Sequence, residues 1–221
     1  GNGEKLATTA TGIDVTGTVT ADGLTVDDGD ILLDSSTQAF LKLDRGSNSS
    51  HYALTRYYTS GTEEWRTGTF NDATSNFYIG TPAGYQLSIT SGGDISFYED
   101  TGITAKFFWD ASAESLGIGT TPSAWNSLMN ATQIGAAASF WGSTNTSVAA
   151  MTANAYYNSA GNYIYINTDE ASQYIQVDGT HSWLNAPSGS AGTTATLTER
   201  MQIDSSGNVG IGTTSPSSYG K

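Results

Sequence analysis

Neighbouring carboxylates are the first residues in this chain that could do chemistry. The adjacent acids considered as catalytic pairs are Glu63-Glu64, Glu99-Asp100 and Asp169-Glu170. Two carboxylates on either side of a sugar can hydrolyse a glycosidic bond. Adjacent side chains of a strand point to opposite faces, however, so Glu63 and Glu64 do not make such a pair by themselves. We interpret these acids as turn or solvent-facing residues.

A nucleophilic site is the second chemical possibility. The chain has no Cys, and its only histidines are His51 and His181. Neither stands beside a serine in the strained Gly-x-Ser-x-Gly turn that exposes a catalytic hydroxyl. We interpret both histidines as surface or subunit-contact residues and predict a chain without catalytic residues, not an enzyme.

Three aspartates in one turn are the candidate metal ligands. Asp27, Asp28 and Asp30 offer hard oxygen ligands of the kind that Ca²⁺ prefers. Their spacing does not match the EF-hand loop, and Asp-Gly turns form without a metal. We therefore expect no metal site and no cofactor.

Aromatic side chains are the candidate binding residues. Flat faces with polar handles can stack on sugar rings, which makes Trp65, Trp183, Tyr157, Tyr163 and Tyr165 possible glycan contacts. Along residues 163–166 the tyrosines share one face of a strand and the isoleucines the other. If the isoleucines are buried, the tyrosines reach the outer face. Alternating aromatics more often build a core, and that is the interpretation we favour.

Charge excludes several partners. The chain has 8 Lys and Arg against 21 Asp and Glu, a net charge of −13. Nucleic-acid binding needs basic residues that neutralise phosphates, so we expect no nucleic-acid partner. The same charge disfavours an anionic membrane surface, and no apolar run reaches the roughly 20 residues of a membrane span. We expect no membrane insertion.

Short hairpin units recur along the chain. Residues 203–211 match residues 89–97 position by position: an apolar residue, polar residues, a turn with Gly beside Asn or Asp, then apolar-x-apolar. Looser copies cover 19–26 and 26–33. Gly-Asn and Asp-Gly steps supply the positive φ that tight hairpin turns require. Isolated hairpins are marginal in water, so these must stack on neighbours or on other chains.

The strand pattern predicts an all-β fold in four parts. Residues 1–34 read as a thin β-shaft with one apolar stripe. Residues 35–122 and 140–221 read as two sandwich- or meander-like modules, each closing on a Gly-Ile-Gly-Thr-Thr element. Residues 123–139 read as a short helix and linker, because Thr121 could cap a helix with Pro122 at its first position.

Several segments resemble the tail fibres of bacteriophages, especially of marine phages. The resemblance is carried by residues 198–216 (TERMQIDSSGNVGIGTTSP), by 12–23 and by 182–186. In that family such a segment often precedes an endosialidase-type intramolecular chaperone. The resemblance implies an elongated, intertwined, parallel homotrimer in the virion tail, an extracellular structure, with other tail or fibre proteins as partners.

The expected function is therefore structural and adhesive: a fibre segment that presents surfaces to a host-cell glycan or protein. A lectin-like glycan-binding module and a bacterial surface adhesin are the alternatives from the class of binding proteins. A polysaccharide depolymerase is the enzymatic alternative.

Overall fold

The structure is a computed structural model. It describes residues 6–9, 12–15, 18–22, 24, 26, 31–33, 38–46, 51–70 and 75–218. The chain forms two compact units, Gly1–Lys42 and Leu43–Lys221. Among the described residues there is no α-helix, and one 3₁₀ turn, η1 (Pro216–Ser218), is the single helical element. The predicted all-β class is confirmed.

The first unit contains one hairpin, in which β1 (Leu6–Thr9) pairs antiparallel with β2 (Gly12–Val15). The other described residues of this unit carry no strand, so the looser hairpins predicted between 19 and 33 are not seen in them. Val19, Leu24 and Ile31 of the predicted apolar stripe are 69%, 77% and 65% exposed. These side chains find little cover within the chain.

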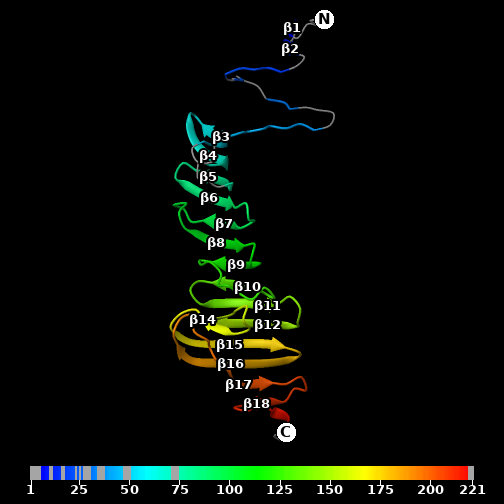
Figure 1. Cartoon of the computed structure of the whole chain (residues 1–221), viewed down its shortest axis with the longest axis vertical. Coiled ribbons are helices and arrows are strands. Elements are labelled where there is room, and N and C mark those ends of the chain that lie inside the picture. Colours follow the sequence, from blue (N-terminus) through cyan, green and yellow to red (C-terminus); the bar gives the residue numbers. More distant parts are fainter. Residues whose placement is uncertain are drawn as a thin grey trace. The chain divides into compact units, whose positions relative to one another are not determined.

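The second unit is built on one 14-stranded sheet (Figure 1). Its strands are β3 (Ala53–Thr59), β4 (Thr62–Thr69), β5 (Phe77–Thr81), β6 (Gly84–Ile89), β7 (Ile95–Tyr98), β8 (Ala105–Asp110), β9 (Ser115–Ile118), β10 (Met129–Ile134), β11 (Ala138–Ser143), β12 (Val148–Ala153), β15 (Asp169–Val177), β16 (Thr180–Gly189), β17 (Thr198–Ile203) and β18 (Val209–Ile211). They lie in chain order across the sheet. All pairs are antiparallel except β9 with β10, which is parallel.

Two strands of the second unit stand outside this sheet. After β12 the chain forms a separate hairpin, β13 (Ala155–Tyr157) with β14 (Tyr163–Tyr165), and then returns to the long sheet at β15.

Tight turns make the meander, as the sequence predicts. Ser60 and Gly61 have φ of 50° and 82° between β3 and β4, and Gly93 and Gly207 have 94° and 83° in the two matching hairpins. Gly adopts this left-handed conformation without steric cost. The predicted hairpins at 89–97 and 203–211 are therefore confirmed as β6–β7 and β17–β18.

One long sheet replaces the two sandwich- or meander-like modules that the sequence predicts. The parallel pair β9–β10 joins the halves, with Leu116 opposite Thr132 and Ile118 opposite Ile134. Backbone pairing therefore continues across the segment that the sequence presents as a linker. Residues 40–44 (FLKLD), whose alternating apolar residues are typical of a strand, have no regular secondary structure.

The helix predicted after Thr121 does not form. Residues 121–126 carry no regular secondary structure and lead into β10. Trp125 is buried, and the side-chain oxygen of Gln133 accepts a hydrogen bond of 2.9 Å from the Ser123 amide. The Asn126 amide donates to the Tyr157 carbonyl at 2.8 Å. These contacts with distant residues hold the segment in place and override the local helix signal.

The core of the second unit lies on one face of the sheet. Ala131, Trp141 and Ala150 stand opposite one another on β10, β11 and β12 and are 2–4% exposed. Trp125 packs on them, and so do the tyrosines of the β13–β14 hairpin. We call this side of the sheet the covered face.

A buried polar network ties this core together. The indole N–H of Trp141 donates to the Thr152 hydroxyl at 2.9 Å, and the Gln173 amide donates to the same hydroxyl at 3.0 Å. Gln173 also donates to the Tyr163 hydroxyl at 3.1 Å. A buried donor must keep an acceptor, because leaving it without one costs free energy.

Replacing Thr152 with valine is therefore expected to lower the free energy of unfolding by about 1–3 kcal/mol. The side chain keeps its shape, but the N–H groups of Trp141 and Gln173 lose an acceptor. Urea unfolding followed by tryptophan fluorescence measures the loss. Thr132→Val, on the opposite side of the sheet, is the matched control and should change stability by less than about 0.5 kcal/mol. Equal losses in the two variants would contradict the assigned role of Thr152.

Candidate functional site: an apolar face along the sheet

Strand register places one residue of each strand from β5 to β18 in a continuous line on the side opposite the covered face. This first ladder is Phe77, Ile89, Ile95, Trp109, Leu116, Thr132, Phe140, Met151, Tyr174, Trp183, Met201 and Ile211. Cross-strand neighbours on one face have side chains close enough to touch. The ladder is therefore one nearly unbroken apolar stripe.

A second ladder runs beside the first, two residues along most strands. It is Thr67, Ile79, Leu87, Phe97, Phe107, Ile118, Ile134, Ala138, Ala153, Ser172, Asn185 and Thr198. We call the two ladders together the apolar face. Neither ladder contains Asp, Glu, Lys or Arg, although the chain has 29 such residues (8 + 21).

Large side chains of the apolar face are exposed to solvent in the single chain. Phe140 and Met151 are each 56% exposed, Ile134 51%, Phe97 46% and Ile211 78%. Scattered exposed apolar residues are normal on a protein surface, but a contiguous patch marks an interaction site.

The apolar face is hollowed on both sides of Phe140. One hollow of about 620 Å³ is lined by Phe140 with Ile95, Phe107, Trp109 and Leu116, among others. The other, of about 500 Å³, is lined by Phe140 with Met151, Tyr174 and Trp183, among others. Phe140 is thus a ridge between two apolar hollows, a relief into which a complementary surface can interlock.

The size of this face is that of a functional surface patch. Each ladder crosses twelve of the fourteen strands, so a strand spacing of about 4.8 Å makes the face about 53 Å long, and two ladders two residues apart give a width of about 10 Å. The resulting area of about 500 Å² lies within the roughly 300–600 Å² of the largest apolar patch on a typical monomer, which is often functional.

Both tryptophans predicted as glycan contacts lie on this side of the sheet. Trp183 belongs to the first ladder, is 37% exposed and packs on Tyr174 with ring centres 5.0 Å apart. Trp65 of β4 lies two residues before Thr67 of the second ladder and is 45% exposed. The two are separated by the strands from β5 to β15, so they do not form one site.

The three tyrosines predicted as glycan contacts gather on the covered face instead. Tyr157 and Tyr163 pack edge to face at 5.0 Å, and Tyr163 also packs on Trp141. Burial raises the pKa of Tyr163. Tyr165 is 5% exposed and donates its hydroxyl to the Pro187 carbonyl. Tyr165 is thus a core residue, in accord with the core interpretation, and Ile164 is not the more buried of the two.

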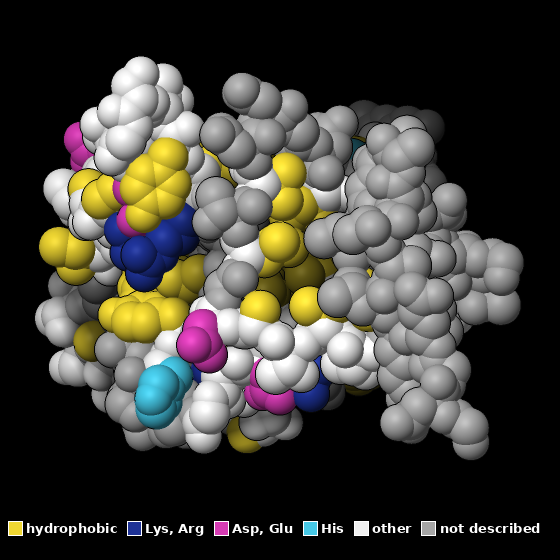
Figure 2. Space-filling model, turned by 90° about the horizontal axis from the view of Figure 1, so that it is seen from above, with side chains coloured by type: hydrophobic (Ala, Val, Ile, Leu, Met, Phe, Trp, Pro, Cys, Tyr) yellow, Lys and Arg dark blue, Asp and Glu magenta, His cyan; other side chains and the backbone are white. Residues whose placement is uncertain are grey.

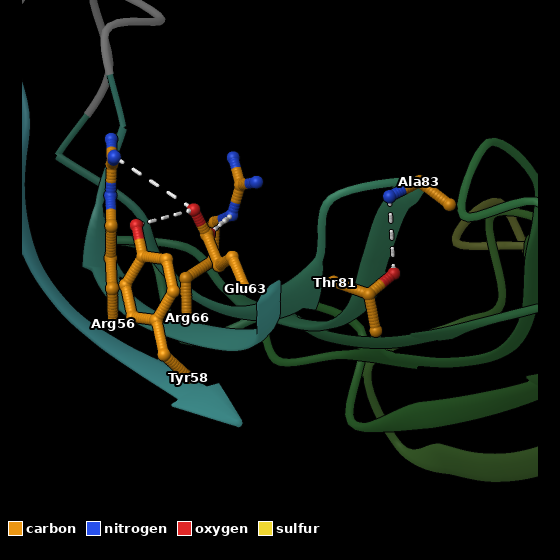
Figure 3. A network of polar contacts seen from close by, with 6 residues as sticks. All are labelled: Arg56, Tyr58, Glu63, Arg66, Thr81 and Ala83. Atoms are coloured by element: carbon orange, nitrogen blue, oxygen red, sulfur yellow. Dashed lines mark hydrogen bonds and ion pairs between the residues drawn. The ribbon is translucent and has the colours of Figure 1, made fainter. Parts of the chain in front are cut away.

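Candidate catalytic residues are dispersed and held by local contacts. Glu63 lies between two arginines, 2.7 Å from Arg66 Nε and 3.8 Å from Arg56, and accepts a hydrogen bond from the Tyr58 hydroxyl (Figure 3). Seen from above, basic side chains lie beside hydrophobic and acidic ones (Figure 2). His181 contacts the Tyr174 hydroxyl through Nδ1. Each of these groups already has a structural partner.

Glu99 closes a loop between β7 and β8. Its Oε1 accepts hydrogen bonds from the Thr101 hydroxyl and from the amides of Thr104 and Ile103, at 2.9 and 3.0 Å for the amides. These bonds, that of Thr101 first, lower the pKa of Glu99 from 4.5 to about 2. Because the folded pKa is depressed, the stabilisation is present above pH 4.5 and is lost as the pH falls through 2.

We expect the Glu99 carboxyl to titrate near pH 2 when its side-chain carbon is followed by NMR. Thr101→Val removes the hydroxyl donor and should move the midpoint toward 4.5. Thr104→Ala keeps the backbone donor and should leave the midpoint low. A midpoint near 4.5 in the unchanged chain would show that the loop is not closed by Glu99.

No group of three or more His, Asp or Glu residues that could hold a metal occurs within the described ranges. Asp27, Asp28 and Asp30, the candidate ligands, lie outside those ranges. No helix in the part of the chain that the structure describes is long and apolar enough to cross a membrane.

The fold and this face define an all-β chain built on one long, mostly antiparallel sheet with an apolar face. Comparison with family models, curated proteins and solved structures finds no match to this chain. The apolar face was missed by sequence reasoning. Its signal is the apolar alternation within each strand, but register between strands was needed to align Phe97, Phe140 and Ile211 into one surface.

Proposed function

We propose that this chain is a structural and adhesive segment of a phage tail fibre, in which copies of the chain pack through their apolar faces. The single observation that carries the proposal is the apolar face, which crosses the sheet from β4 to β18 without a charged residue in either ladder. A surface of this kind is costly to leave in water.

A second copy of the chain is the partner that fits this face best. A partner must offer an apolar surface about 53 Å long with a relief that repeats at the strand spacing, and another copy has both. Copies that run parallel bring equivalent strands to the same height. The count of three comes from the tail-fibre resemblance.

In such an assembly the covered face and the hairpin turns point outward. Glu99, Asp178 and Asp204 are charged residues that lie in or beside these turns. The outer surface is the part available to a host-cell glycan or protein. Trp65 and Trp183 would be covered by association, which disfavours them as glycan contacts.

The mass in solution tests the proposal. Sedimentation equilibrium is expected to give three times 23.1 kDa at micromolar concentration. A monomer with its apolar face open at that concentration would refute assembly through this face.

Binding to a glycan array and to bacterial cells separates the functional alternatives. Attachment without release of sugar products supports an adhesive segment. Release of oligosaccharides from a bound polysaccharide would instead establish the depolymerase alternative and overturn the proposal.

A further inference from the structure

A three-stranded motif occurs twice in the long sheet, first as β7–β8–β9 and again as β16–β17–β18. In each motif two antiparallel pairings are followed by a turn at the second glycine of a Gly-Ile-Gly sequence. The equivalent rows of opposed residues are Phe97, Phe107 and Ile118 in the first motif and Trp183, Met201 and Ile211 in the second. The register also shifts at the same place, leaving Lys106 of β8 and Arg200 of β17 without an opposite residue.

The chain leaves both motifs through a glycine with a positive φ and the same backbone hydrogen bond. The Gly119 amide donates to the Lys106 carbonyl at 2.7 Å, and the Gly212 amide donates to the Arg200 carbonyl at 2.9 Å. Gly119 and Gly212 have φ of +72° and +71°. The chain then folds back over a buried glycine in the last strand of each motif, Gly117 in β9 and Gly210 in β18.

A proline lies over this glycine in both crossovers, one residue later in the second, which has the extra residue Ser215. It is Pro122 over Gly117 in the first motif and Pro216 over Gly210 in the second. The sequence repeat continues beyond the proline, since 122–125 reads Pro-Ser-Ala-Trp and 216–219 reads Pro-Ser-Ser-Tyr. Both crossovers thus begin alike.

In the first motif, β7–β8–β9, this crossover leads to a strand that pairs in parallel. That strand is β10, which pairs with the outer edge of β9, and the Gly135 amide donates to the Ile118 carbonyl at 2.8 Å. Gln133 of β10 accepts hydrogen bonds from the Ser123 amide at 2.9 Å and from the Trp125 indole at 3.4 Å. Strand and crossover are thereby locked to each other.

In the second motif, β16–β17–β18, no strand pairs with the equivalent outer edge within the described part of the chain, because β18 is the last strand of the sheet. The Asp204 amide bonds to the Asn208 carbonyl, and the Gly212 amide to that of Arg200. Because hydrogen bonding alternates along an antiparallel pair, the N–H and C=O groups of Val209 and Ile211 point to the outer edge.

A groove lies beside the outer edge of β18, where β10 lies beside β9. A groove of about 380 Å³ is lined by residues 209–213 and Pro216. Ile211 is 78% exposed, whereas its equivalent Ile118, which β10 flanks, is 41% exposed.

We propose that the outer edge of β18 binds an extended strand in parallel, in the way that β9 binds β10. The strand that fits has a β10-like pattern: apolar or β-branched residues beside Val209 and Ile211, and a carboxamide side chain between them that accepts from the Ser217 amide. Strand addition of this kind gains affinity from main-chain hydrogen bonds and specificity from alternate side chains. This inference rests on the repeated motif and not on the fibre proposal.

The test grafts the known strand onto the open edge. Residues 217–221 are replaced by a copy of residues 123–135, and amide hydrogen exchange is followed in the full chain. We expect exchange at Val209 and Ile211 to slow by about tenfold or more relative to the unextended chain. The matched control carries the same thirteen residues with the polar and apolar positions of the strand exchanged, and should give no protection.

A substitution on the acceptor strand tests the geometry. Ile211→Pro removes an outward N–H without touching the bonds from β18 to β17, and should cancel the protection of Val209 in the grafted chain. If the grafted and control chains exchange at the same rate, the β18 edge is not a strand acceptor. Sedimentation of the same samples reports association through the apolar face separately, so a failure here leaves that proposal standing.

Discussion

Phe140→Glu is expected to dissociate the assembled chains while leaving each chain folded. Phe140 is the ridge between the two hollows of the apolar face and is 56% exposed in the single chain, so folding does not depend on its burial. In an assembly the carboxylate introduced at position 140 would be buried against the apolar face of another copy, with no cation or hydrogen-bond donor beside it. An uncompensated buried charge costs about 3 kcal/mol or more, which raises the dissociation constant by a factor of about a hundred.

Sedimentation velocity over a range of concentrations measures the shift, and circular dichroism checks that the strands persist. Ser159→Glu introduces the same charge in the exposed turn between β13 and β14 and is the matched control. Should Phe140→Glu associate as tightly as the control, the apolar face is not the contact between copies.

Gly117→Ala, which adds a single methyl group, is expected to lower the stability of the chain strongly. A Cβ at position 117 would stand 2.0 Å from the Thr120 carbonyl oxygen and 2.9 Å from Pro122. Both belong to the crossover that leads from β9 to β10, so the methyl group would force it off the sheet. Overpacking against backbone costs about 3 kcal/mol, and here it acts on the link between the two halves of the sheet.

Gly142→Ala is the matched control, because its Cβ would meet nothing closer than the Val148 carbonyl at 3.4 Å. Gly210→Ala, with a closest contact of 2.8 Å, should fall between the two. Denaturant unfolding of the three variants ranks them. A loss at position 117 no greater than that at 142 would mean that the crossover does not pack on β9 as described.

Local features of the sequence were sufficient to predict the hairpins. In 89–97 and 203–211 the turn residues and the apolar alternation lie within nine residues of one another, so short-range sterics decide the conformation. The β3–β4 hairpin has a turn of the same local kind, with Gly61 at a φ of 82°.

Predictions failed where distant residues decide the conformation. The Thr121-Pro122 helix signal is a weak local preference. It is overridden by burial of Trp125 and by hydrogen bonds that the segment donates to the side-chain oxygen of Gln133 and to the carbonyl of Tyr157. For Tyr165 the favoured core interpretation agrees with its burial, but the surface that covers it was not predictable, because the β13–β14 hairpin packs on the long sheet and not in it.

The sequence by itself determined that the chain is all-β, that its turns are tight and that its hairpins need neighbours, because these properties depend on residues close together in the chain. Only the tertiary structure decided which neighbours they have. Strand register, set by pairing across the whole sheet, aligned Phe140, Trp183 and the rest of the ladders into one charge-free face. It also left the edge of β18 open where the equivalent edge of β9 is paired. Of the paired carboxylates, Glu99 closes a turn and Glu63 lies in an ion pair, because the fold brings hydrogen-bond donors to these two side chains.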